Sequence, residues 1–467
     1  MGLGKELGEG ERERSLFAKV AFGQVTFELE DGMEVPSINS SPLKNLYFSD
    51  TARLDEFFDH TSIQEISTAK DRTNDVHIMK DISTIEAIMT GFAERTGLTP
   101  PARPPRRYLW TDAFAVCNYL ELFRQTGQEQ YQQDAKRLVS QVHRVLGRHR
   151  EDDARLGWIS GLDEEKGEQH PTQGGLRIGK ELGERGPDEP YDEHLEWERD
   201  GQYFHYLTKW MHALDCLARV TRDSVYNRWA LELAKSAHSC FTYSPWGGGS
   251  KRMYWKMSID LSYPLVPSMG QHDPLDGLIT YQELQATAMK LADPHAEPPL
   301  GTEIAEMTAV CEGMTWTTDD PLGIGGLLSD ACRLAQLMIS TNLRESDRLV
   351  SLLRDAELGL EDFVWRRPLN ASADYRLAFR ELGLSIGLHA IVEMQRTIEQ
   401  HPENFSNQQE LDARLSRLVR FLPLTELIES FWLEPINQQS HSWTGHRDIN
   451  SVMLSTSLAP DGYLVLQ

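Results

Sequence analysis

A helical hairpin that occurs twice constrains the fold of this chain more than any other feature. Six residues recur in the same register about 95 positions further on. The matching sets are Leu122, Arg124, Thr126, Tyr131, Ala135 and Leu138 in the first copy, and Leu217, Arg219, Thr221, Tyr226, Ala230 and Leu233 in the second. A spacing shared across helix, turn and helix indicates one supersecondary unit used again. The repeat therefore predicts an architecture built from helical hairpins.

The two helices of the second hairpin differ in how much of their surface is apolar. The helix over residues 203–217 has apolar side chains around most of its circumference, which is typical of a helix surrounded by protein. Its partner over residues 226–241 carries one apolar stripe opposite Arg228, Glu232 and Lys235. A single stripe is typical of an outer helix with one face in water. The hairpin therefore pairs an inner helix with an outer helix.

The same alternation continues along the chain and predicts six inner and six outer helices. Inner helices are expected to start near Asp112, Gln202, Pro274, Leu322, Arg376 and His446, and outer helices near Glu129, Ser224, Thr302, Asp347 and Gln409. The sixth inner helix lacks an outer helix after it, and the helix around residues 82–92 would supply that partner and close the ring.

The predicted fold class is therefore all-α, an (α/α)6 toroid of six helical hairpins over residues 76–467. Residues 1–75 read differently, as an N-terminal extension that is partly strand or irregular, because apolar and polar residues partly alternate there. An open solenoid of helix pairs is the alternative architecture. The connections vary from a few residues to about fifty, whereas solenoid repeats keep a more even length, so the pattern favours the ring.

The charge and cysteine content exclude several classes of protein. A net charge of -24 repels phosphate backbones, so no nucleic-acid partner is expected. No apolar run approaches the roughly 20 residues that cross a bilayer, and residues 1–14 lack the apolar core of a secretory signal. The five cysteines form no C-x-x-C pair, which argues against structural zinc. We therefore expect a cytoplasmic protein with no membrane partner, no metal ion and no cofactor.

The hairpin count, the Trp-rich connections and the acidic starts of the inner helices resemble one known group of proteins. This is the six-hairpin glycosidase and N-acylglucosamine 2-epimerase-like superfamily of (α/α)6 toroids. The resemblance covers roughly residues 78–467 and is one of architecture, since the chain carries no family signature. It implies a site at one mouth of the ring, at one end of the inner helices.

Acidic residues near two inner-helix starts are the first candidates for catalysis. Asp112 follows Trp110 at the start of the first inner helix, where it also reads as a helix cap. Glu198 and Asp200 lie just before the second inner helix, where a solvated helix start explains them equally well. Glycoside hydrolysis needs two carboxyl groups about 5 to 10 Å apart, one of them protonated. Asp112 and Glu198 are one pair that different hairpins could bring together.

The third inner helix begins with a segment that also carries chemistry. Asp273 and Pro274 read as an N-cap and a first helical residue. That explanation leaves His272 and Asp276 without a structural role. We predict His272 as a base or hydrogen-bond donor, with Asp276 orienting it or acting as an acid.

Further candidates are aromatic, basic and amide side chains near the helix starts and in the long connections. Such groups stack against a sugar ring or bind its hydroxyls. The predicted substrate-binding residues are Trp110, Trp158, Arg177, Trp197, Arg199, Gln202, His205, Trp255, Lys256 and His446.

Three functions follow from these candidates. The leading hypothesis is an intracellular glycoside hydrolase with paired carboxylates, its predicted catalytic residues being Asp112, Glu198, Asp200, His272 and Asp276. The first alternative is a sugar epimerase or isomerase that uses His272 with His446 or His205 as a pair of bases. The second alternative is a helical-repeat binding protein without catalysis. The expected partner is a small-molecule or oligosaccharide substrate, and the sequence leaves homo-oligomerisation open.

Overall fold

The computed structural model describes residues 17–21, 24–28, 82–101, 104–291 and 299–466. The chain divides into two compact units, Met1–Met79 and Lys80–Gln467. In the first unit, β1 (Phe17–Ala21) and β2 (Gln24–Glu28) pair antiparallel. The boundary expected between residues 75 and 76 lies outside the described residues.

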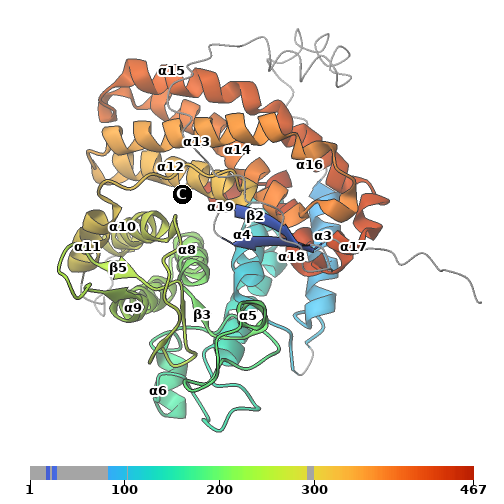
Figure 1. The fold of residues 1–467 in the computed structure, drawn as a ribbon, viewed down its shortest axis with the longest axis vertical. Helices are drawn as coiled ribbons and strands as arrows, with labels where there is room; N and C mark the ends of the chain where they lie inside the picture. Colours follow the sequence, from blue (N-terminus) through green and yellow to red (C-terminus); the bar gives the residue numbers. More distant parts are fainter. Residues whose placement is uncertain (1–16, 22–23, 29–81, 102–103, 292–298, 467) are drawn as a thin grey trace, which may run out of the picture. The chain divides into compact units, whose positions relative to one another are not determined.

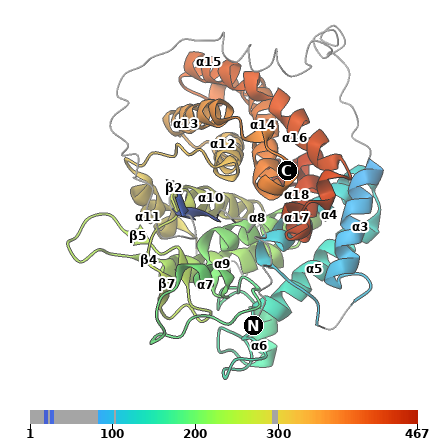
Figure 2. The same ribbon diagram turned by 45° about the vertical axis from the view of Figure 1, so that its right-hand side comes forward.

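Six helices of the second unit pack side by side in a closed ring, which Figures 1 and 2 show from two directions. These inner helices are α4 (Leu109–Thr126), α8 (Phe204–Thr221), α10 (Asp273–Leu291), α12 (Pro321–Thr341), α14 (Ala378–Gln400) and α18 (Arg447–Leu458). Each contacts the next, and α18 contacts α4. That last contact confirms the (α/α)6 toroid and excludes the open solenoid.

Outer helices pack against the ring from outside, as α13 and α15 do around α12 and α14 in Figure 1. They are α5 (Glu129–Leu146), α9 (Ser224–Phe241), α11 (Gly301–Cys311), α13 (Ser346–Arg366), α15 (Gln408–Leu418), α16 (Pro423–Leu433) and α3 (Ile82–Thr96). Helix α3 contacts α18 and α4, so it is the closing partner predicted from the sequence. The fifth outer position holds two short helices instead of the one expected, and the second begins at a proline, which interrupts helices.

The repeated residues form the turn that joins an inner helix to its outer partner. Thr126 and Thr221 each donate a side-chain hydrogen bond to a backbone oxygen four residues earlier, that of Leu122 or Leu217, at 2.7 Å. The same hydroxyls accept a backbone N–H two residues later. In the first copy, the next residue is Gly127, which adopts a left-handed backbone with φ of 67°, a conformation that glycine takes without strain. The repeat is therefore a helix-stop signal used twice.

Each outer helix returns the chain to the end of the ring where the next inner helix begins. The longest connections lie at this end, which we call the N-terminal end of the ring. They contain short elements, namely α6 (Glu164–Gln169), α7 (Glu193–Glu198), β3 (Gln202–Tyr203), β4 (Thr242–Tyr243), β5 (Arg252–Met253), β6 (Lys256–Met257), β7 (Pro264–Val266) and α17 (His441–Thr444). Strands β3, β6 and β7 form an antiparallel sheet in that order, and β4 pairs with β5. Short 3-10 turns occupy Pro368–Asn370, Ala373–Tyr375, Pro402–Asn404, Val419–Phe421 and Asn437–Gln439.

The end of the chain turns back into the ring. Helix α19 (Asp461–Leu464) follows α18 and contacts α4, α8 and α12. Tyr463 is buried and stacks on Phe114, with ring centroids 4.6 Å apart. Gln336 of α12 donates to the backbone oxygen of Leu464 at 2.8 Å. This segment therefore packs among the inner helices as part of the core.

Helix α12 is long and apolar enough to cross a membrane by length and composition alone. However, 72% of its apolar window is buried inside the protein, as in the core helix of a soluble protein. Its glycines bring it unusually close to α14, since a Cβ atom at Gly325 would lie 2.0 Å from the backbone oxygen of Gly383. The apolar character of α12 is therefore explained by its place in the ring.

This close approach gives a prediction about stability. Replacing Gly325 with Ala forces a methyl group into the α14 backbone, and overpacking of this kind costs about 1–3 kcal/mol. Gly326 is the matched control, because a Cβ there meets nothing within 4 Å, and Ala is the better helix former by about 1 kcal/mol. In urea denaturation we expect G325A to lower the free energy of unfolding and G326A to raise it. Equal effects would contradict the glycine contact.

Candidate active site

Aromatic rings gather at the N-terminal end of the ring, where α4 and α8 begin. Tyr108 and Trp110 pack against Tyr206 with ring centroids 5.7 and 5.3 Å away, and the two tyrosine hydroxyls are hydrogen-bonded at 2.7 Å. Trp255, from a long connection, stacks on His205 with centroids 6.1 Å apart. We call this group the mouth cluster; its members are Tyr108, Trp110, Tyr203, His205, Tyr206, Trp255 and Asp273.

An acid and an imidazole face each other within the mouth cluster. Asp273 Oδ1 lies 3.7 Å from His205 Nδ1. Burial and, to a smaller extent, the nearby Asp276 carboxylate raise the pKa of Asp273 to about 8, although Lys209 opposes the shift. Burial lowers the pKa of His205 to about 4. Near neutral pH the pair therefore consists of a protonated carboxylic acid and a neutral imidazole.

Three buried polar atoms of the mouth cluster have no hydrogen-bond partner. They are Trp110 Nε1, His205 Nδ1 and Asp273 Oδ2. The rings of Trp110 and His205 are in contact, at 6.1 Å between centroids. Buried polar groups in folded proteins nearly always have partners, so these three atoms leave room for hydrogen bonds to water or to a ligand. The three atoms present both donor and acceptor capacity to a hydroxylated molecule.

One turn further along α10, both carboxylate oxygens of Asp276 accept hydrogen bonds from other side chains. Its oxygens accept from Lys209 Nζ and Arg333 Nη2, both at 2.8 Å, and from the hydroxyl of Thr208. Two cations hold the pKa of Asp276 well below its usual range, despite burial. These contacts do not fit the expected role of Asp276 as an acid. Asp276 instead keeps a fixed negative charge beneath Asp273, which favours the protonated form of Asp273.

His272 also differs from its expected role. Its Nε2 donates to the backbone oxygen of Trp316 at 2.7 Å, and burial lowers its pKa, so the ring is neutral. It makes no hydrogen bond or ion pair with Asp276 among the described residues. The neighbouring Asp273, expected to be a helix cap, is already the first residue of α10. The segment therefore supplies an acid at Asp273, where the sequence predicted a cap.

The proposed hydrolase pair, Asp112 and Glu198, occupies two different environments. Asp112 is 1% exposed, pairs with Arg107 at 3.3 Å and accepts the backbone N–H of Tyr108 at 3.0 Å. Burial raises its pKa to about 6. Glu198 ends α7 and is exposed to solvent. Asp112 thus fixes the start of α4, and of the two carboxylates only Glu198 is exposed to solvent.

Several other predicted residues hold the long connections in place. Asp200 is fully buried, pairs with Arg177 at 2.6 Å and accepts the backbone N–H of Gly179 at 3.0 Å. Gln202 donates to the backbone oxygen of Ile259 at 2.6 Å and accepts from the N–H of Leu176 at 2.8 Å. Buried groups with all their bonds made to the protein have little capacity left for a ligand. These residues therefore position the site rather than line it.

Lys256, Arg199 and Trp158 have similar supporting contacts. Lys256 pairs with Glu196 at 2.9 Å and is buried. Arg199 pairs with Glu189. Trp158 is 2% exposed and lies beneath the guanidinium of Arg148.

The outer part of the site is polar and carries one exposed indole. Trp197 is 44% exposed and packs edge-on against Trp255, with centroids 4.9 Å apart. Glu198 is near enough to His446 and Lys180 to raise the pKa of each, although burial lowers both overall. Trp197, Glu198, Lys180 and His446 thus form a rim outside the mouth cluster, and three of these four were predicted from the sequence.

Sequence reasoning missed Tyr108, Tyr206, Asp273 and Lys209. Asp273 was assigned to helix capping because Pro274 follows it. The remaining signal was the unusual run of aromatic residues and His205 at the start of α8, which was read as a buried helix surface.

Comparisons with known proteins do not identify the chemistry of this chain. No family model matches the chain, and no curated protein matches it. One solved structure to which it is similar is described as the crystal structure of sugar epimerase from ruminal bacterium. The similarity covers 75% of this chain and 87% of that chain, at 8% sequence identity and a TM-score of 0.40.

The protonation states of the pair can be measured directly. In an NMR titration we expect Asp273 to titrate near pH 8 and His205 near pH 4, because both are buried. The D273N and H205Q variants assign the two signals by their loss. Midpoints for both groups at the values of exposed side chains would contradict the buried acid and imidazole.

Proposed function

We propose that this protein is a sugar isomerase that moves a proton between the carbonyl carbon and its neighbour. The observation that supports this most is the juxtaposition of Asp273 and His205, 3.7 Å apart, each with an unpaired polar atom. Proton transfer at carbon needs a base and an acid in their active protonation states at working pH. A neutral imidazole and a protonated carboxyl group meet that requirement together.

The proposed step balances within this pair. His205 takes the proton from the carbon beside the carbonyl, while Asp273 gives its proton to the carbonyl oxygen. The product of this step is an enediol, with an imidazolium and a carboxylate left on the protein. The imidazolium then gives its proton to the former carbonyl carbon, and the hydroxyl group on the neighbouring carbon gives its proton to Asp273. This interconverts an aldose and a ketose and restores both groups. Lys209 and Thr208 both donate hydrogen bonds to Asp276, and none of the three is proposed to contact the sugar. We therefore assign them a positioning role.

The aromatic wall supports a sugar as the substrate. Trp110, Tyr203 and Trp255 present rings around His205, and the C–H face of a sugar packs on such rings. The exposed indole of Trp197 extends the wall toward the rim. We propose a cytoplasmic location, which is supported by five cysteines that are all free thiols, namely Cys117, Cys216, Cys240, Cys311 and Cys332.

Glycoside hydrolysis is the second candidate, in a form different from the one the sequence suggested. Asp273 would be the general acid, because its raised pKa keeps it protonated. The exposed carboxylate of Glu198 would be its partner in place of Asp112. This version depends on Glu198, whereas the isomerase depends on His205.

Incubation with free aldoses and ketoses in heavy water separates the two candidates. For the isomerase we expect deuterium at the carbon beside the carbonyl, detected by mass spectrometry. The D273N and H205Q variants should lose about 10²–10⁴-fold in rate, the usual contribution of a general acid or base. E198Q and the exposed control D188N should keep the wild-type rate. Cleavage of glycosides without exchange into free sugars, with loss in E198Q, would instead support the hydrolase.

The pH dependence of kcat/KM provides an independent check. Activity should fall as the pH rises through about 8, because Asp273 loses its proton, and fall as the pH drops through about 4, because His205 gains one. The profile should therefore be bell-shaped with a broad plateau. A rate that increases from pH 7 to pH 9 would contradict Asp273 as the acid.

A further inference from the structure

Two thiols and an imidazole converge inside the ring, away from the mouth cluster. Cys117 of α4 and His212 and Cys216 of α8 are all buried. One ligand atom from each, the two Sγ atoms and a ring nitrogen, lies within 4.8 Å of the other two. His212 and Cys216 are four residues apart, so they share one face of α8. Cys117 approaches that face from the adjacent inner helix.

The spacing of these atoms suits a metal ion. Cys216 Sγ lies 3.5 Å from His212 Nε2. Zinc binds sulfur at about 2.3 Å and nitrogen at about 2.0 Å in a tetrahedron, which places neighbouring ligand atoms about 3.5 Å apart. The donor set of two sulfurs and one imidazole is one that zinc and related soft ions prefer.

His212 is already oriented as metal-binding histidines usually are. Its Nδ1 hydrogen-bonds both oxygens of Glu283, at 2.9 and 3.0 Å, and its Nε2 lies on the side of Cys216 Sγ. Glu283 is held in turn by Arg219 and Arg333, at 3.0 and 3.1 Å. A carboxylate behind the ligating ring is the common supporting arrangement in metal sites. Nε2 also lies 2.9 Å from the backbone oxygen of Tyr463, a contact that an ion would replace.

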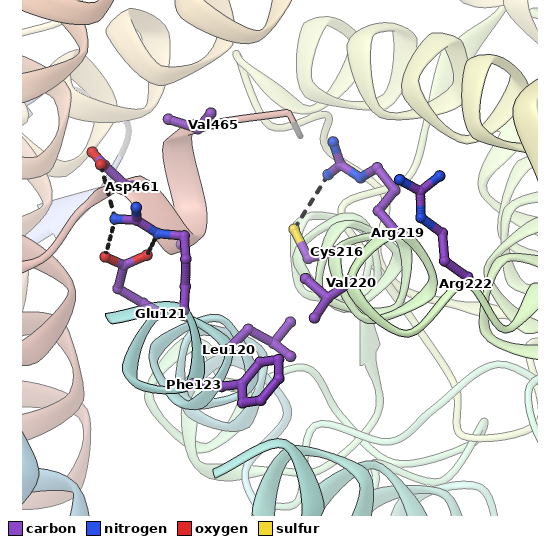
Figure 3. Close-up of a pocket in the computed structure, with 11 residues that line it drawn as sticks. Leu120, Glu121, Phe123, Cys216, Arg219, Val220, Arg222, Asp461 and Val465 are labelled. Atoms are coloured by element: carbon purple, nitrogen blue, oxygen red, sulfur yellow. Dashed lines mark hydrogen bonds and ion pairs between the residues drawn. The ribbon is translucent and has the colours of Figure 1, made fainter. Parts of the chain in front are cut away.

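The cluster adjoins a pocket of about 240 Å³ between α4, α8 and the end of the chain. Figure 3 shows the sulfur of Cys216 beside this space, close to Arg219. The pocket is lined by Leu120, Glu121, Phe123, Arg124, Cys216, Arg219, Val220, Arg222, Asp461, Gly462 and Val465. Arg219 Nη2 lies 3.4 Å from Cys216 Sγ, a contact that suits a negatively charged sulfur. A ligand in the pocket therefore has access to the Cys216 side of the cluster.

We propose that Cys117, His212 and Cys216 bind a divalent ion of the zinc type, whose fourth position is reached from the pocket. Three protein ligands with one open position distinguish an exchangeable or reactive zinc site from a closed structural one. Binding releases the thiol protons and the Nε2 proton, so two thiolates neutralise the ion inside the ring. This site is separate from the mouth cluster, and the proposal does not depend on the sugar chemistry.

Cobalt substitution tests the site without any activity assay. The metal-free full-length protein is titrated with Co²⁺, which gives strong absorption bands only in a tetrahedral site with sulfur ligands. We expect one equivalent to bind with these bands, and Zn²⁺ to displace it. The bands should be lost in C117S, C216S and H212Q, and kept in C332S, which alters another fully buried thiol of the ring. D273N should also keep them.

Three outcomes would overturn the proposal. The first is wild-type protein, prepared under reducing conditions, that binds no Co²⁺. The second is binding that survives C216S, because the ion would then lie elsewhere. The third is a Cys117–Cys216 disulfide in protein purified with reductant present, detected as a mass loss of two hydrogens, because the two thiols would then be a redox pair. The first and third outcomes need only the wild-type protein, so unstable variants do not obscure the result.

Discussion

The buried guanidinium of Arg333 is the interaction on which both sites of this protein depend. It reaches from α12 to Asp276 and Glu283 of α10, and to Asp330 of its own helix, at 2.5 to 3.1 Å. Removing one partner of such a buried network leaves an unpaired charge and costs about 3–5 kcal/mol. The pairing therefore fixes how α10 and α12 sit beside each other along the ring axis.

The two α10 carboxylates that pair with Arg333 support different sites, one at each side of Arg333 along the helix. Asp276 remains charged one turn from Asp273, and its charge helps to keep Asp273 protonated. Glu283, two turns further on, orients His212 toward the thiols. A single cation thus supports an acid at the N-terminal end of the ring and a proposed metal site deeper inside it.

The architecture of the ring could be predicted from the sequence, because it depends on signals that lie close together in the chain. The apolar surface of each helix and the Thr-based turn set the order of inner and outer helices. The site was harder to predict, because its chemistry depends on partners from other hairpins. Asp276 is a carboxylate like Asp273, yet it pairs with Lys209 and Arg333, which lie on other hairpins and come near only in the folded chain. Cys117 likewise approaches Cys216 only because α4 and α8 are neighbours.

The unpaired polar atoms of the mouth cluster are the feature that most directly suggests a ligand. A crystal structure with bound sugar would show whether the sugar hydrogen-bonds to them. Crystals of the D273N variant soaked with monosaccharides would retain bound substrate if that variant cannot turn it over. We predict a sugar oxygen within hydrogen-bond distance of residue 273 and of Trp110 Nε1, with the sugar ring against Trp255. A sugar bound only at Trp197 and Glu198, with Trp110 Nε1 and His205 Nδ1 still unpaired, would contradict it.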